Sequence, residues 1–187
     1  MRILLISDFF DSYKRWRHSK GYGVHSPYAF RMVKDVVRPG NYGYYGYDLI
    51  DAVLGSKNSS PELKLKELRL LLRLLVFLHS KRLLAIGPLT QGMLAVAHGA
   101  GVEAETFRQS SDLQKDDLVI ISNIKTTSEA LKKSLGDKTP IIAISPSPEI
   151  RNFMMQPLSH GLLLTGSDIM ILIPRPEMHY VSYSMKF

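Results

Sequence analysis

The sequence predicts an α/β fold: a three-layer sandwich around a mostly parallel sheet, with a terminal antiparallel hairpin and an N-terminal helical extension. Two runs, Leu118–Ile121 and Ile141–Ile144, are continuously apolar, as in strands that helices cover on both faces. Helical segments separate most of the apolar runs. None separates the last strand segments, and the final stretch HYVSYSMKF alternates polar and apolar residues, which indicates the hairpin.

Size and composition are typical of one globular domain. The chain has 187 residues, of which 45% are hydrophobic, enough for a full-sized core. It has no cysteine, so neither a disulfide framework nor a thiolate metal site is available. No apolar run approaches the ~18 residues of a transmembrane helix. The apolar start is interrupted by Asp8 and is too short for a secretory signal. We therefore expect a cytoplasmic protein that does not use a membrane.

The net charge of +7 is unevenly distributed. Residues 1–82 contain 15 Lys and Arg against 7 Asp and Glu, a net charge of +8, whereas residues 83–187 contain 9 against 10, a net charge of −1. The basic half predicts either an anionic partner or a solvated surface, and charge alone does not separate these alternatives.

The first 58 residues are predicted to form a basic, aromatic-rich extension, and residues 59–187 a shortened α/β domain. A helix begins the extension. A second helix starts at Ser26-Pro27, because Ser26 can cap it and proline loses no needed N–H at the first helical position. It ends near Val37, and the glycine- and tyrosine-rich stretch 41–47 is predicted to form turns.

The α/β domain opens with a leucine-rich helix from about Ser60 to Leu78, in which Ser59 and Glu62 have the spacing of a capping box. Strands are predicted at Leu83–Ile86, Glu103–Phe107, Leu118–Ser122, Ile141–Ile144, Gly161–Thr165, Ile169–Ile173 and Tyr180–Lys186. Further helices are predicted at Thr90–His98, Thr127–Leu135 and Pro148–Met155.

Two segments carry a family resemblance. Residues 82–97 (RLLAIGPLTQGMLAVA) have the pattern of a strand, a glycine turn and a helix start, and residues 21–30 read GYGVHSPYAF. With the order of elements, they make the chain similar to class I S-adenosylmethionine-dependent methyltransferases, from about Tyr13 to Phe187. It resembles most a bacterial O-methyltransferase-like branch with a G-x-G-[VI]-H-S-P-[FY] segment. The resemblance implies a Rossmann-like fold with S-adenosylmethionine at the carboxyl edge of the sheet, and no metal is expected.

The chain departs from the family pattern at several strand ends. Ala85 stands where the family has an acid, and Gly87 and Gly92 are one residue further apart than the usual glycines. The fourth and fifth family strands end in aspartates, whereas here Ser122 and Ser145-Pro146 follow the apolar runs. Only about 10 residues separate the second and next strands, too few for the family's third strand and its helices.

Each candidate residue has a structural alternative. Gly87 and Gly92 would contact the cofactor or form a strand-to-helix turn. Glu105 would hold the ribose or be a solvated acid at a strand end. His25, a candidate on the substrate side, would act at the mouth of the site or fix the local turn.

Two other groups of residues also have two interpretations each. Ser122 and Asn123 stand where a catalytic acid is expected, and a neutral polar cap is the favoured interpretation because serine needs an activating partner. The basic-aromatic segment 14–20 (KRWRHSK) would bind nucleic acid or form an ordinary exposed helix end, and the second interpretation is favoured.

Two functions follow. The first is a divergent, shortened methyltransferase-like protein with weakened or lost activity, in which any catalysis would come from positioning the acceptor against the sulfonium. The second is a non-catalytic module that binds a protein or nucleic-acid partner through the basic N-terminal half. The catalytic residues and the methyl acceptor stay unassigned.

Overall fold

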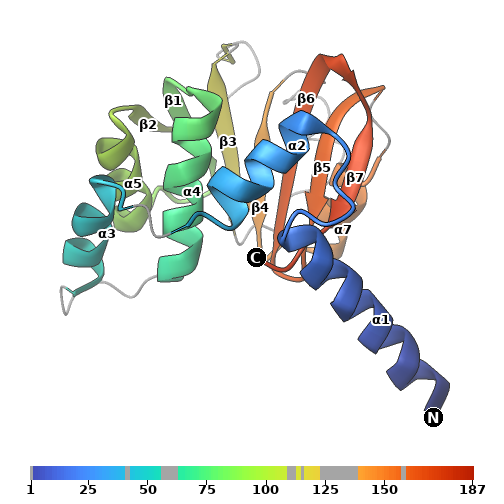
Figure 1. The fold of residues 1–187 in the computed structure, drawn as a ribbon. Coiled ribbons are helices and arrows are strands. Elements are labelled where there is room, and N and C mark those ends of the chain that lie inside the picture. The colour runs from blue at the N-terminus through green and yellow to red at the C-terminus, as the bar shows by residue number, and fades with distance from the viewer. Residues whose placement is uncertain are drawn as a thin grey trace.

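A computed structural model of the chain describes residues 2–40, 43–55, 63–108, 113–114, 116–122, 139–156 and 159–187. These residues form one seven-stranded sheet in the order β2-β1-β3-β4-β6-β5-β7, with helices on its two faces (Figure 1). The prediction of a Rossmann-like α/β sandwich with a mostly parallel sheet is confirmed.

The parallel part of the sheet lies in its first half. Strand β1 (Arg82–Ile86) pairs in parallel with β2 (Glu103–Thr106) on one side and β3 (Asp117–Ser122) on the other. Strand β3 pairs in parallel with β4 (Ile141–Ile144). In the sheet that the described residues form, β2 is the edge strand beside β1, in agreement with the short segment between β2 and β3.

The second half contains the antiparallel hairpin. Strand β6 (Ile169–His179) runs antiparallel to both β4 and β5 (His160–Thr165) and lies between them. The last strand, β7 (Val181–Ser184), then returns to pair in parallel with β5. The hairpin is therefore formed by β5 and β6, and the alternating C-terminal stretch adds a further edge strand to it.

Helices bury both faces of the sheet. Neighbouring residues of β1 enter different core clusters, since Leu83 and Ala85 belong to one and Leu84 to the other, as the alternation of side chains along a strand requires. The first cluster is covered by α2 (Pro27–Met32), the π-helix η1 (Val33–Val37), α3 (Gly46–Gly55), α4 (Leu65–Leu78) and α5 (Gln91–Ala100). The second is covered by α7 (Pro148–Met154).

The N-terminal segment joins the same core and also extends beyond it. Val33, Val36 and Ile50 pack in one cluster with the leucines of α4. By contrast, α1 (Arg2–Ser19) projects away from the sheet, and only its C-terminal end lies against β7 (Figure 1). There His18 Nδ1 lies 3.2 Å from the carbonyl oxygen of Ser184, and its ring meets Tyr183 edge-on.

The structure confirms one predicted helix start and moves another. The predicted start of α2 is confirmed, because the Ser26 hydroxyl accepts a hydrogen bond from the N–H of Ala29 at 3.3 Å. Helix α4, in contrast, begins at Leu65 and not near Ser60. It is capped where the N–H of Lys64 donates to the Glu67 carboxylate at 2.8 Å. The predicted capping box at 59–62 and the predicted helix at 127–135 lie outside the described residues.

The sequence did not predict helix α3, whose first two residues, Gly46 and Tyr47, overlap the stretch expected to form turns. It packs on α5 where Gly46 meets Gly99, and a Cβ added to Gly46 would lie 3.0 Å from the Gly99 Cα. This close approach explains a glycine at the first position of a helix. None of the helices in the described part of the chain is long and apolar enough to cross a membrane.

Candidate functional site

The carboxyl edge of the parallel strands is where α/β sheets usually bind ligands. Strands β1 to β4 run parallel, so Gly87, Thr106, Ser122 and Ser145 end or follow them at one edge. All four residues are uncharged.

Gly87 forms the turn between β1 and α5. Its φ of +120° is in the region that favours glycine, so the chain reverses here without side-chain strain. Thr90 then caps α5, with its hydroxyl accepting a hydrogen bond from the N–H of Met93 at 3.2 Å. Pro88 is exposed, and Leu89 packs against the core. Gly87 thus keeps the backbone accessible at the carboxyl edge.

Gly92 has a packing role. It lies in the first turn of α5, and a Cβ added there would lie 2.9 Å from Leu68 Cδ1 of α4. The missing side chain therefore lets α5 approach α4, and it faces a neighbouring helix. The two glycines of the motif do not form one surface for a cofactor.

Glu105 is on the edge strand β2, in register with Leu84 at the middle of β1. Its carboxylate is 3.6 Å from the guanidinium of Arg82, the first residue of β1, and its side chain is 54% exposed. This placement agrees with a solvated acid on a strand, and the carboxylate is paired with a residue at the opposite end of β1 from Gly87.

His25 lies near the amino edge of the sheet, at the opposite ends of the strands from Gly87. Its neighbour Ser26 donates a hydrogen bond to the Met178 sulfur at 3.6 Å, near the end of β6. Strand β6 begins beside the carboxyl end of β4 and runs antiparallel to it, so its end lies at the amino edge of the parallel strands. The structure therefore does not bring His25 and Gly87 together.

The two serines at strand ends have backbone roles or are buried. Ser122 is buried at the end of β3, and Asn123 lies outside the described residues. Ser145 has a φ of +50°, and its N–H donates to the carbonyl oxygen of Asp168 at 2.6 Å. Ala85, where the family pattern has an acid, is buried in the core. These positions offer no ionised group to a ligand.

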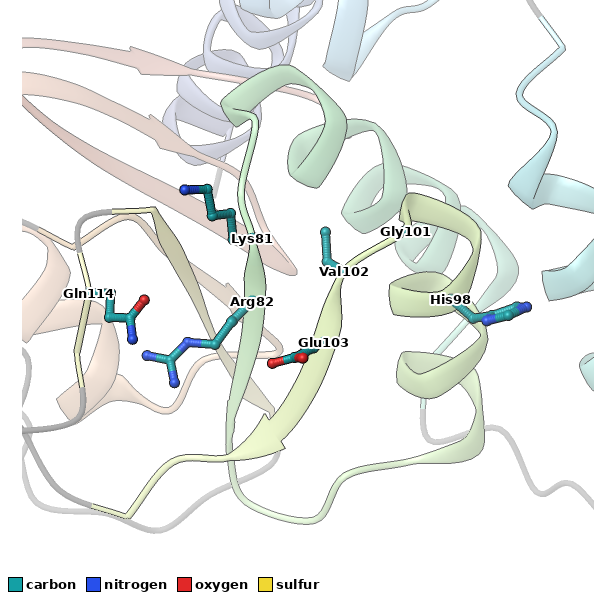
Figure 2. Close-up of a pocket in the computed structure, with 7 residues that line it drawn as sticks. All are labelled: Lys81, Arg82, His98, Gly101, Val102, Glu103 and Gln114. Carbon is teal, nitrogen blue, oxygen red and sulfur yellow. The ribbon is translucent and has the colours of Figure 1, made fainter.

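The amino edge holds a pocket of about 580 Å³ that no motif of the sequence predicts (Figure 2). Arg82 reaches across it toward Gln114, whereas His98 points away (Figure 2). The Arg82 guanidinium donates two hydrogen bonds, of 2.9 and 2.8 Å, to the carboxylate of Asp117, which is 1% exposed. This bond raises the pKa of Arg82 further above its ordinary value. The pocket's central cation is therefore paired within the fold.

Most of the basic-aromatic segment lies on the projecting helix α1. Four exposed residues, Tyr13, Lys14, Trp16 and Arg17, form what we term the outer face of α1. The rings of Tyr13 and Trp16 stack with centroids 6.0 Å apart, and the Arg17 guanidinium carbon is 6.0 Å from the Tyr13 centroid. The segment is thus an exposed surface with stacked rings beside cations.

His18 fixes this surface to the sheet. Burial lowers its pKa below the ordinary value, and the charges of Lys14 and Arg17 act in the same direction, against the hydrogen bond to Ser184. The neutral ring is therefore favoured, with Nδ1–H donating to the Ser184 carbonyl.

Of the predicted site residues, only Gly87 remains available at the carboxyl edge; the others are placed apart from it. Across the described ranges, no group of three His, Asp or Glu side chains could hold a metal ion. No family model, curated protein or solved structure matches this chain.

Proposed function

We propose that this chain is a binding module on a shortened, divergent methyltransferase-like fold, with methyl transfer weakened or lost. The parallel sheet with its antiparallel hairpin and the glycine turn after β1 support the fold part of the proposal. Two observations support the loss of methyl transfer. The strand ends at the carboxyl edge are uncharged, and the candidate cofactor residues Gly87, Gly92 and Glu105 do not face one common ligand. A cytoplasmic location, expected from the absence of cysteine, is part of the proposal.

The outer face of α1 is the observation that carries the binding part. Tyr13 is 50% exposed and Trp16 is 43% exposed, beside Lys14 and Arg17, on a helix that projects from the sheet (Figure 1). Exposed aromatic side chains that form one group on a surface often mark a binding site. The cations attract an anionic partner, and the aromatic rings provide a stacking surface that does not depend on the sequence of that partner.

The binding of labelled anionic polymers by the protein tests this proposal. We expect the protein to bind at least one of single-stranded RNA, single-stranded DNA or polyglutamate at about 50 mM salt, and to lose most of this binding at about 200 mM salt. Arg17→Gln and Tyr13→Ser should each weaken binding severalfold.

The control is Lys34→Gln, which removes an equal charge from an exposed position on η1. It should leave the retention nearly unchanged. Absence of binding to all three polymers at low salt, or equal effects of Arg17→Gln and Lys34→Gln, would contradict the proposal.

Residual methyl transfer is a second candidate, favoured by the φ of +120° at Gly87. A glycine at this turn lets the backbone approach a ligand closely. S-adenosylmethionine would supply the methyl group, and the chain would only need to position the acceptor. Calorimetric titration with S-adenosylhomocysteine tests this candidate. Binding in the micromolar range that Gly87→Ala abolishes would support it, and no heat at millimolar ligand would exclude it.

A further inference from the structure

We propose that a pocket at the carboxyl edge, distinct from the glycine turn, binds a phosphate monoester. The pocket has a volume of about 260 Å³ and lies between α1, the first turn of α4, the β5–β6 turn and the segment after β7. The residues that line it include three with cationic side chains, Arg15, Lys66 and Lys186, and two serines, Ser12 and Ser167. The proposal does not depend on the outer face of α1.

The turn that forms one wall is held in place by hydrogen bonds. The guanidinium of Arg151 donates to the carbonyl oxygens of Gly166 at 3.1 Å and Ser167 at 2.7 Å. The carbonyl of Asp168 accepts the 2.6 Å bond from Ser145 at the end of β4. This wall is therefore rigidly joined to the carboxyl edge of the sheet.

The other walls are fixed as well. The N–H of Met185 donates to the Thr165 carbonyl at 2.6 Å, which holds the segment that carries Lys186. The contact of His18 with Ser184 holds the part of α1 that carries Arg15. The cations thus come from three separate elements whose backbones are set by the fold, which is the arrangement of a preformed site.

The cationic residues of the lining favour an anionic ligand. Three of the lining side chains are cationic and one, that of Asp168, is a carboxylate, so the lining side chains have a net positive charge. Within the described residues, Arg15, Lys66 and Lys186 form no ion pair, either with Asp168 or with another carboxylate, and none of the three has a hydrogen bond between side chains. A phosphate monoester carries close to two negative charges above its second pKa, about 6, and Arg, Lys and Ser are its usual protein partners.

An apolar side of the pocket suits the organic part of such a ligand. Ile169 and Met185 are buried and are among the residues that line the pocket. The ring of Phe187 lies against Gly166, where a Cβ would meet ring carbons at 2.6 and 2.9 Å. The volume admits a phosphate with a small apolar group, so phenyl phosphate is a suitable probe.

The pocket can be tested separately from the outer face. Successive helix residues are rotated by about 100°, which places Ser12 and Arg15 on one side of α1 and Tyr13 and Arg17 on the other. Substituting Arg15 therefore changes the pocket and leaves the aromatic stack in place.

Calorimetric titration with phenyl phosphate at about pH 7.5 and low salt tests the site. We expect saturable binding by the full chain, at least tenfold weaker in Arg15→Gln and in Lys186→Gln. Benzoate, with a similar ring and one charge, should bind at least tenfold more weakly than phenyl phosphate. Asp168→Asn should tighten binding severalfold, which a merely destabilised variant would not do.

Lys34→Gln is the matched control and should bind as the native chain does. A parallel titration uses vesicles of phosphatidylcholine with and without phosphatidic acid. Binding only to phosphatidic acid, lost in Arg15→Gln and Lys186→Gln, would support the site with a lipid headgroup as the source of the phosphate. No binding to either probe, or equal losses in Lys34→Gln, would overturn the proposal.

Discussion

At the residue scale, single glycines hold backbone conformations that no other residue adopts without strain. Gly161 begins the buried part of β5 at a shift in register with β6, and its φ is +133°. A Cβ at this position would collide with the carbonyl oxygen of Ile173 and lie 3.0 Å from the Pro174 Cα. Both contacts are with backbone, so the hairpin cannot relax by turning a side chain.

Gly161→Ala should therefore lower the free energy of unfolding by about 3 kcal/mol, from strain and steric overlap together. Urea unfolding followed by circular dichroism measures this change. Gly43→Ala is the matched control, because a Cβ at Gly43 meets nothing within 4 Å and its φ is not in the strained region. A loss in Gly161→Ala no larger than in Gly43→Ala would contradict the geometry of the hairpin.

The pair of Arg82 and Asp117 shows why a buried charge depends on its partner. Asp117 is 1% exposed, and its carboxylate also accepts the N–H of Gln114 at 2.6 Å. Arg82→Met would leave this carboxylate buried without its cation and should cost about 3 kcal/mol of unfolding free energy. The double variant with Asp117→Leu should recover most of that loss. Additive losses in the double variant would show that the pair is not coupled.

The pH dependence of α1 attachment follows from His18. Burial lowers the pKa of His18 in the folded protein, so the unfolded or detached state takes up the proton more readily. The stabilisation from the neutral ring is fully present above the ordinary pKa, about 6.5, and is lost as the pH falls through the folded value. We expect the His18 ring to titrate below 6.5 by NMR, and the protection of the α1 amides, measured relative to their intrinsic exchange rates, to fall under acid conditions. A His18 pKa at or above 6.5 would be the wrong sign.

At the element scale, the apolar runs were sufficient to predict the central strands β1, β3 and β4, because a parallel strand buried on both faces has few polar positions. Local caps were equally informative where the capping residue stands next to the helix, as at Ser26. Helix α3 could not be predicted in this way. Its docking depends on Gly99, which lies far along the chain on α5, and the local glycine- and tyrosine-rich pattern is typical of turns.

Gly99→Ala tests the contact that positions α3. A Cβ there would lie 2.9 Å from the Gly46 Cα, a backbone atom. Although alanine favours the helix by about 1 kcal/mol, the forced separation should make the net effect a loss of about 1–2 kcal/mol. Hydrogen exchange should rise selectively in α3. Unchanged protection of α3 in a variant of native stability would contradict this account of its packing.

The candidate site illustrates a different limit. The sequence supplied Gly87 as a turn, which the φ value confirms. It could not show that Gly92 faces Leu68, since the direction depends on how α4 crosses α5. Nor could it show that His25 lies at the amino edge, because that depends on the direction in which β6 enters the sheet.

At the scale of the whole molecule, the structure shows where the excess positive charge of the N-terminal half lies. The surplus of +8 in residues 1–82 includes the cations of the projecting helix α1, while the α/β half is nearly neutral. The outer face of α1 and the pocket beneath the same helix therefore stand where an anion would be attracted to the molecule. The uncharged carboxyl ends of β1, β3 and β4 contribute nothing to that attraction.

Fluorescence of Trp16 tests the central proposal most directly. It is the only tryptophan in the chain, and it lies on the outer face of α1. We expect its emission to shift or be quenched, saturably, on titration with single-stranded RNA, single-stranded DNA or polyglutamate, and the change to disappear at about 200 mM salt or in Arg17→Gln. Lys34→Gln should respond as the native chain does. Emission that stays constant with all three polymers at low salt would contradict a binding role for α1.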